Sequence, residues 1–133
     1  MPKRVNVDQG RFPVACVFDV LDESEFLDAL SSFSEGVGVS HEESACDFPG
    51  ELAAYDVKPI ESYGYIEFWA SPGEQTVRIG FAEFLYYTRQ AVESEINSFP
   101  QNKQTLIMLL VAIENKIIEL ERLHLLYLAR HIE

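Results

Sequence analysis

The first strong pattern along the chain is a helical repeat of apolar residues. Asp22 and Glu25 form a D-x-x-E capping box before it, and Gly36 stands where a C-cap glycine belongs. The pattern predicts a helix over residues 23–34. Its apolar face is made by Phe26, Leu27, Leu30 and Phe33. Residues 13–21 fit both a helical and an alternating spacing, so a strand and a helix that begins at residue 14 both stay open.

The middle of the chain has the composition and alternation of strands. Residues 63–70 are rich in aromatic and β-branched side chains, and residues 75–79 follow after a turn at 71–74. Together they predict an antiparallel hairpin. Its core face is expected to carry Ile66, Phe68, Val77 and Ile79. Tyr65 and Trp69 alternate with these residues and face either the core or a partner.

The segment between these elements is polar. Residues 36–40 predict a short strand, and residues 41–60 predict an acidic, turn-rich loop with one helical turn at 51–55. Binding residues are often found in such exposed loops, so this segment is the first place to look for a binding surface.

Two long helices are predicted at the end of the chain. Apolar spacing predicts the first over residues 81–98, and Ser98 is expected to cap a second helix that runs from about residue 99 to residue 130. In that helix apolar positions repeat every 3.5 residues, at Leu106, Leu110, Ile113, Ile117, Leu120, His124 and Tyr127. The apolar surface is broader than a coiled-coil seam, which favours packing on helix 81–98 and the sheet over dimerisation.

The order of these elements predicts the fold class. We expect one α+β domain over residues 1–133, in which a small antiparallel β-sheet packs with an N-terminal helix and two long C-terminal helices. The chain has 133 residues, of which 47% are hydrophobic and 12% aromatic. That length and composition are enough to bury a hydrophobic core.

The same composition disfavours membrane and secreted proteins. The longest apolar run, 106–113, has eight residues, whereas a membrane span needs roughly 18. The first residues lack the apolar segment of a secretory signal, and two cysteines are too few for a disulfide scaffold. We therefore expect a cytoplasmic protein that does not bind membranes.

Charge is distributed unevenly along the chain. The sequence has 22 acids against 10 lysines and arginines, a net charge of −12. Between Phe12 and Val57 there are eleven acids and no lysine or arginine. Such a surface repels nucleic acid and attracts basic proteins. Solubility would explain scattered acids, but acids clustered in this way favour a functional acidic face.

Motifs for catalysis or metal binding are weak. His41, Glu42, Glu43, Asp47 and Glu51 offer nitrogen and oxygen ligands, and a metal-dependent enzyme that uses them is one hypothesis. Their spacing matches no metal motif, so a solvated acidic loop is the preferred interpretation.

The remaining candidates for chemistry are single residues. Cys16 and Cys46 are not placed near a base by any pattern, and Cys46 stands among acids that raise a thiol pKa. His124 and His131 are two ligands at most, and residues 36–38 lack the third glycine of a phosphate loop. We expect no enzyme activity, no metal and no cofactor.

Four segments within residues 36–95 resemble a known family. They are Gly36-Val37-Gly38-Val39-Ser40, Phe48-Pro49-Gly50-Glu51-Leu52, Gly64-Tyr65-Ile66-Glu67-Phe68-Trp69 and Val77-Arg78-Ile79-Gly80-Phe81-Ala82-Glu83-Phe84-Leu85-Tyr86-Tyr87. They resemble the immunity proteins of bacterial contact-dependent growth inhibition systems, of the type paired with ribonuclease toxins. Gly80 departs from the serine cap usual there, and the leucine-rich last helix is longer than the family pattern.

The resemblance implies a protein that binds and neutralises a cognate toxin nuclease, with a ribonuclease expected. A ribonuclease holds RNA phosphates in a basic cleft, which an acidic protein can block. The expected contact residues are acids within 19–56 and two aromatic anchors: Asp19, Asp22, Glu23, Glu42, Glu43, Asp47, Glu51, Tyr55, Asp56 and Tyr63. The alternative is an acidic structural or adaptor protein that forms a homodimer through residues 106–127.

Overall fold

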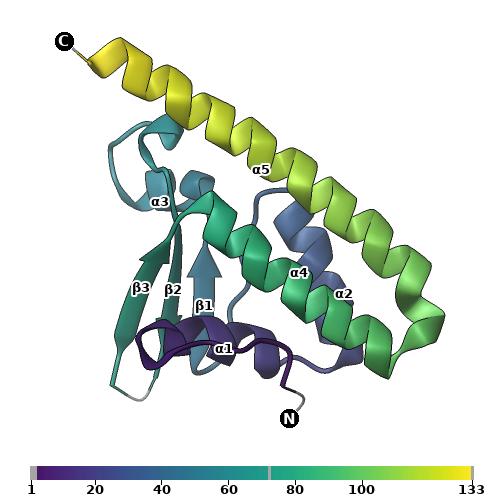
Figure 1. Cartoon of the computed structure of the whole chain (residues 1–133). Helices are drawn as coiled ribbons and strands as arrows, with labels where there is room; N and C mark the ends of the chain where they lie inside the picture. Colours follow the sequence, from purple (N-terminus) through teal and green to yellow (C-terminus); the bar gives the residue numbers. More distant parts are fainter. Residues whose placement is uncertain (1–2, 72, 133) are drawn as a thin grey trace.

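The computed structural model describes residues 3–71 and 73–132 (Figure 1). Helices and one small sheet make up this part of the chain, which confirms the α+β class. The helices are α1 (Phe12–Asp19), α2 (Glu23–Ser34), α3 (Pro49–Tyr55), α4 (Phe81–Ser98) and α5 (Lys103–His131). The strands are β1 (Ser44–Asp47), β2 (Ile66–Ala70) and β3 (Gln75–Ile79), and short 3₁₀ turns lie at Gln9–Arg11, Ile60–Ser62 and Pro100–Asn102.

The sheet is antiparallel, with β2 between β1 and β3. Ile66 pairs with Ile79 and Phe68 with Val77, which confirms the predicted hairpin and its core face. Alternate residues point to the other face of the sheet, which is partly exposed. There the register aligns one row of three residues, Asp47, Glu67 and Arg78, and a second row, Ala45, Trp69 and Thr76.

Aromatic rings from five parts of the chain meet in the core. The rings of Phe33 and Phe48 lie 5.6 Å apart, and those of Phe48 and Phe84 lie 5.3 Å apart. Phe18 and Phe68 complete the group at 6.3 Å from each other. These contacts hold α1, α2 and α4 against β2 and the start of α3. Each aromatic pair stabilises the fold by about 1 kcal/mol beyond the hydrophobic contribution of the surface it buries.

Helix α5 lies across α2 and α4 (Figure 1). Leu106, Ile113, Ile117 and Leu120 are buried, so most of the predicted 3.5-residue repeat is used within the chain. Beyond Leu120, α5 holds the 3₁₀ turn at Ile60–Ser62, because the carbonyl oxygen of Glu61 lies 3.1 Å from Nδ1 of His124. Arg130 lies 3.8 Å from the carboxylate of the same Glu61.

The strand predicted at residues 36–40 is wrong, and the strand β1 was not predicted. Residues 36–40 form no strand; Ser40 makes a single bridge to Ala45, and the strand is β1, inside the segment predicted as a loop. The core positions of β1 are Ser44 and Cys46, which are small and give little apolar signal. Gly38 packs so closely on the Cys46 carbonyl group that a β-carbon there would collide with it.

The helix boundaries were predicted more closely. The capping box of Asp22 and Glu25 is present, with hydrogen bonds of 2.8 and 2.9 Å, and Gly36 has the expected positive φ of 74°. Most of residues 13–21 lie in a separate helix, α1, which ends at Asp19, rather than in a strand or an extension of α2. Ser98 was predicted wrongly as a cap: it ends α4, and Asn102 precedes α5 after a 3₁₀ turn.

Candidate partner-binding surface

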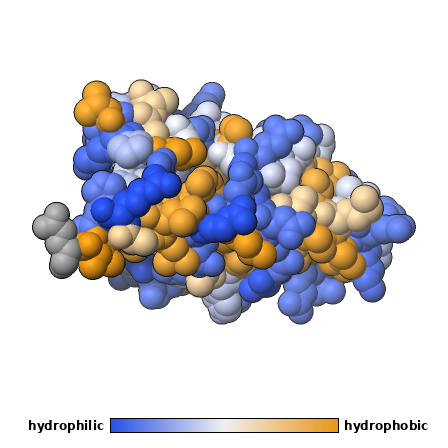
Figure 2. Space-filling model, turned by 90° about the horizontal axis from the view of Figure 1, so that it is seen from above, coloured by the Kyte–Doolittle hydropathy of each residue, from blue (hydrophilic) through white to orange (hydrophobic). Residues whose placement is uncertain are grey.

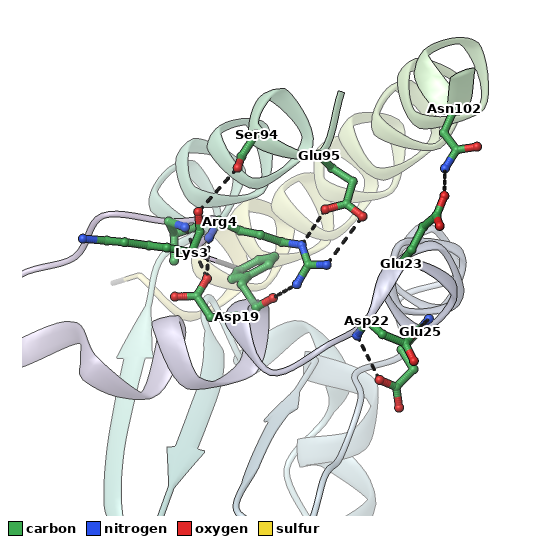
Figure 3. A network of polar contacts seen from close by, with 11 residues as sticks. Lys3, Arg4, Asp19, Asp22, Glu23, Glu25, Ser94, Glu95 and Asn102 are labelled. Carbon is green, nitrogen blue, oxygen red and sulfur yellow. Dashed lines mark hydrogen bonds and ion pairs between the residues drawn. The ribbon is translucent and has the colours of Figure 1, made fainter. Parts of the chain in front are cut away.

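Three of the predicted contact acids take part in holding the fold together (Figure 3). Asp19 accepts a 2.7 Å hydrogen bond from the backbone N–H of Arg4, and burial nevertheless raises the pKa of its carboxyl. Asp22 caps α2. Glu23 accepts a 2.6 Å hydrogen bond from the side-chain amide of Asn102, which ties α2 to the start of α5. These carboxylates still add negative charge to their side of the molecule.

Glu51 also stabilises the fold. Its Oε1 accepts hydrogen bonds from the backbone N–H of Gly38, at 2.8 Å, and of Phe48, at 2.9 Å. One carboxylate oxygen thus caps α3 and fastens the 36–40 segment beside it.

Glu42 and Glu43 are exposed in the turn before β1. The neighbouring His41 does not turn toward them but lies 3.3 Å from Glu25 of α2. Glu42 and Glu43 are therefore accessible to a partner.

The other four predicted residues come together around one hollow. Asp47 ends β1, Tyr55 ends α3, and Asp56 and Tyr63 lie on the connection to β2. The hollow has a volume of about 390 Å³. We call it the tyrosine hollow; it is lined by Asp47, Leu52, Tyr55, Asp56, Lys58, Tyr63, Tyr65, Glu67 and Arg78.

Negative charge is concentrated on one wall of the tyrosine hollow. Asp47 stands opposite Glu67 in the sheet, and like charges in this position repel. Burial raises the pKa of Asp47, and the nearby carboxylates of Glu51 and Glu67 raise it further. Arg78 donates a 3.0 Å hydrogen bond to Glu67. Among the described residues, no hydrogen bond or ion pair reaches the Asp47 carboxylate.

Three tyrosines supply the other walls. The side chain of Tyr55 is 84% exposed, whereas that of Tyr63 is only 6% exposed. The Tyr63 hydroxyl is buried without a hydrogen-bond partner in the described part of the chain. Burial raises its pKa, and the carboxylate of Asp56 adds to the rise. Tyr65 packs edge-on against Tyr63, with ring centroids 5.8 Å apart, and carries the Arg78 guanidinium 4.9 Å above its ring.

Sequence reasoning did not include Glu67 and Arg78 among the site residues. The signal was present in the hairpin, because the alternation that puts Ile66 and Phe68 in the core puts Glu67 on the other face. The same alternation leaves Tyr65 and Trp69 half-buried on that face. Arg78 follows from the strand register, which places it opposite Glu67.

The candidate metal ligands and the thiol of Cys46 can be placed in the structure. Within residues 3–71 and 73–132, no group of three His, Cys, Asp or Glu side chains is arranged to hold a metal ion. Cys46 is buried, and its surroundings raise the pKa of its thiol to about 12. A thiol with that pKa is a poor nucleophile at neutral pH.

A comparison with protein families identifies the family of the chain. The family model described as CDI immunity protein matches residues 11–110, which run from the turn before α1 into the first part of α5. The chain belongs to the family of CDI immunity proteins. The match supports the resemblance inferred from residues 36–95 and extends it toward both ends.

Comparisons with curated proteins and with solved structures found no further relative of this immunity protein. No curated protein and no solved structure matches the chain. None of the helices in the described residues of the immunity protein is long and apolar enough to cross a membrane.

Proposed function

We propose that this immunity protein, acting as a single domain in the cytoplasm, neutralises a basic toxin nuclease through its acidic surface. The expected toxin is a ribonuclease. Membership of the family implies a cognate toxin. The observation that carries the acidic-surface proposal is the run from Phe12 to Val57, with eleven acids and no lysine or arginine. The protein acts by binding, without catalysis of its own.

Six of the predicted residues are the proposed direct contacts. They are Glu42 and Glu43 in the turn before β1 and four residues of the tyrosine hollow, Asp47, Tyr55, Asp56 and Tyr63. Asp19, Asp22, Glu23 and Glu51 are proposed to add to the electrostatic field while they hold the fold.

Charge and aromatic residues would contribute to different rate constants. A nuclease cleft is positive because it must hold phosphates, so clustered carboxylates steer the two proteins together and raise the association rate. Aromatic side chains buried at the centre of an interface slow dissociation. Occupation of the cleft by carboxylates would exclude the nucleic-acid substrate.

The test uses the C-terminal domain encoded by the reading frame upstream of this gene. Its binding is measured by calorimetry at low and high salt, and RNA cleavage is assayed with and without the immunity protein. We expect nanomolar affinity that weakens with salt, and loss of cleavage in the complex. Absence of binding would overturn the proposal.

A variant separates the acidic loop from the rest of the protein. Replacement of Glu42, Glu43 and Asp47 together by alanine is expected to slow association and flatten its salt dependence. Unchanged affinity and salt slope would show that the interface lies elsewhere.

One observation favours the second candidate, an adaptor that forms a homodimer. Seen from above, hydrophobic side chains lie among hydrophilic ones (Figure 2). Exposed apolar residues on α5 include Ile107, Met108, Val111, Ile118, Leu125 and Leu126. The predicted 106–127 seam is largely buried within the chain, so a dimer would use these outer residues. Sedimentation as a monomer at micromolar concentration would exclude this candidate.

A further inference from the structure

We propose that the tyrosine hollow receives an arginine side chain of the toxin, whose guanidinium pairs with the Asp47 carboxylate among the tyrosine rings. This inference rests on the proposed function, because it names the chemical group by which the partner enters the surface. The tyrosine hollow would be one arginine-binding position within the broader acidic face.

The charge balance of the hollow leaves a place for one more cation. Arg78 forms an ion pair with Glu67, with Nε 3.0 Å from the carboxylate oxygen, and Nζ of Lys58 lies 4.0 Å from a carboxylate oxygen of Asp56. Asp47 is flanked by the carboxylates of Glu51 and Glu67 and has no cation beside it among the described residues. An incoming guanidinium would therefore relieve repulsion as well as form an ion pair.

The buried hydroxyl of Tyr63 provides a second observation. Only 6% of Tyr63 is exposed, and its hydroxyl has no hydrogen-bond partner within the described chain, although the Asp56 carboxylate is near enough to raise its pKa. Buried polar groups in native proteins are nearly always paired, so an unpaired hydroxyl beside a hollow indicates a ligand group that completes it. A guanidinium has five N–H donors and can donate to both a carboxylate and a phenolic oxygen.

The hollow already shows how its side chains hold a guanidinium. Arg78 stacks over the ring of Tyr65 at 4.9 Å while its Nε donates to Glu67. The planar guanidinium suits both contacts at once, whereas a lysine ammonium offers a point charge without a stacking plane. A second guanidinium would find the same two kinds of group in Asp47 and the tyrosines.

The shape of the hollow fits a long side chain. Its volume of about 390 Å³ lies within the range of small-ligand sites. Leu52 provides an apolar contact for the methylene stem. The ring of Tyr55, 84% exposed, would gain cover when a partner docks.

The test compares two variants that each remove one negative charge. Asp47→Asn alters the hollow, and Glu93→Gln removes an exposed acid of α4 that does not line it. Calorimetry with the domain encoded upstream should show roughly a 10- to 100-fold loss of affinity for Asp47→Asn and less than about twofold for Glu93→Gln. Thermal unfolding of free Asp47→Asn should be unchanged or shifted upward, because the charge it removes is repelled in the folded state.

The outcomes separate this inference from the proposed function. If the wild type binds and both variants lose affinity equally, net charge alone acts and the hollow is not an arginine site. If the wild type does not bind, the proposed function fails and the inference fails with it. A large loss confined to Asp47→Asn supports both.

Two further measurements identify the partner group. The ¹³C resonance of the Asp47 carboxyl carbon, followed against pH, should report a lower pKa in the complex than in the free protein. Arginine-to-lysine changes across the toxin domain should include one whose effect disappears in the Asp47→Asn background. An unchanged pKa, or coupling to lysines alone, would overturn the arginine assignment.

Discussion

Glu51 and Asp47 lie four residues apart, yet their carboxylates have different surroundings. Glu51 accepts two backbone hydrogen bonds, whereas Asp47 has none among the described residues and an elevated pKa. Sequence alone could not separate them, because one of the donors to Glu51 comes from Gly38, thirteen residues earlier. The identity of an acid predicts its charge, and the folded backbone decides whether that charge is available to a partner.

Asp19 and Asp47 predict a pH dependence of stability. Burial raises both pKa values above the ordinary 3.8, so the folded protein binds protons at these groups before the unfolded chain does. Their contribution to the free energy of unfolding therefore increases as the pH falls from their folded-state pKa values toward 3.8. Urea unfolding from pH 7 to pH 4 should show this rise, and Asp47→Asn should reduce it. A steeper rise in the variant would contradict the assignment.

We expect the buried thiol of Cys46 to be unreactive in the folded protein. Its thiol is buried and has a pKa of about 12, so almost none of it is ionised at pH 8. We expect a disulfide exchange reagent to modify Cys46 at the rate of unfolding, with full reaction in denaturant. Cys16→Ser provides a protein with Cys46 as its one thiol. Rapid labelling of that variant under native conditions would refute the prediction.

At the scale of elements, the helices and strands that have clear local sequence signals were predicted correctly. The bounds of α2, β3 and α4 agree with the predicted ranges, because capping residues, a turn and regular apolar spacing define them. β1 was missed because its core side chains are small and its place depends on pairing with β2. The tyrosine hollow could not be predicted as a unit, since β1, α3, β2 and β3 form it jointly.

Arg4, which precedes α1, is joined to Glu95 of α4 by a buried ion pair (Figure 3). Arg4 Nε donates to Glu95 at 2.8 Å, its Nη1 donates to the Phe18 carbonyl at 2.7 Å, and its guanidinium lies 4.5 Å above the Phe26 ring. Arg4→Met leaves the Glu95 charge buried without this partner. We expect a loss of about 3–5 kcal/mol in the free energy of unfolding, measured with urea.

The matched control for this ion pair is the double variant. Arg4→Met with Glu95→Leu removes both charges and replaces them with apolar groups, which should recover most of the stability. A double variant as unstable as Arg4→Met would show that the lost contacts of Arg4 with Phe18 and Phe26, rather than the unpaired charge, cause the destabilisation.

For the whole molecule, the net charge of −12 opposes compact folding. Eleven of the acids lie between Phe12 and Val57, where no lysine or arginine compensates them. Salt screens this repulsion more than it weakens a few exposed ion pairs. The melting temperature should therefore rise by several degrees between about 10 and 200 mM salt. A constant or falling melting temperature would show that the ion pairs outweigh the repulsion.

The contact between α5 and Glu61 determines how the protein would respond to truncation of α5. The buried core residues end at Leu120, and the lining of the tyrosine hollow ends at Arg78. A stop codon at position 122 would keep all of them but remove His124 and Arg130, which hold the turn next to Tyr63. We expect such an allele to encode a folded protein with weakened binding. Its carrier would make immunity protein and still be sensitive to the toxin.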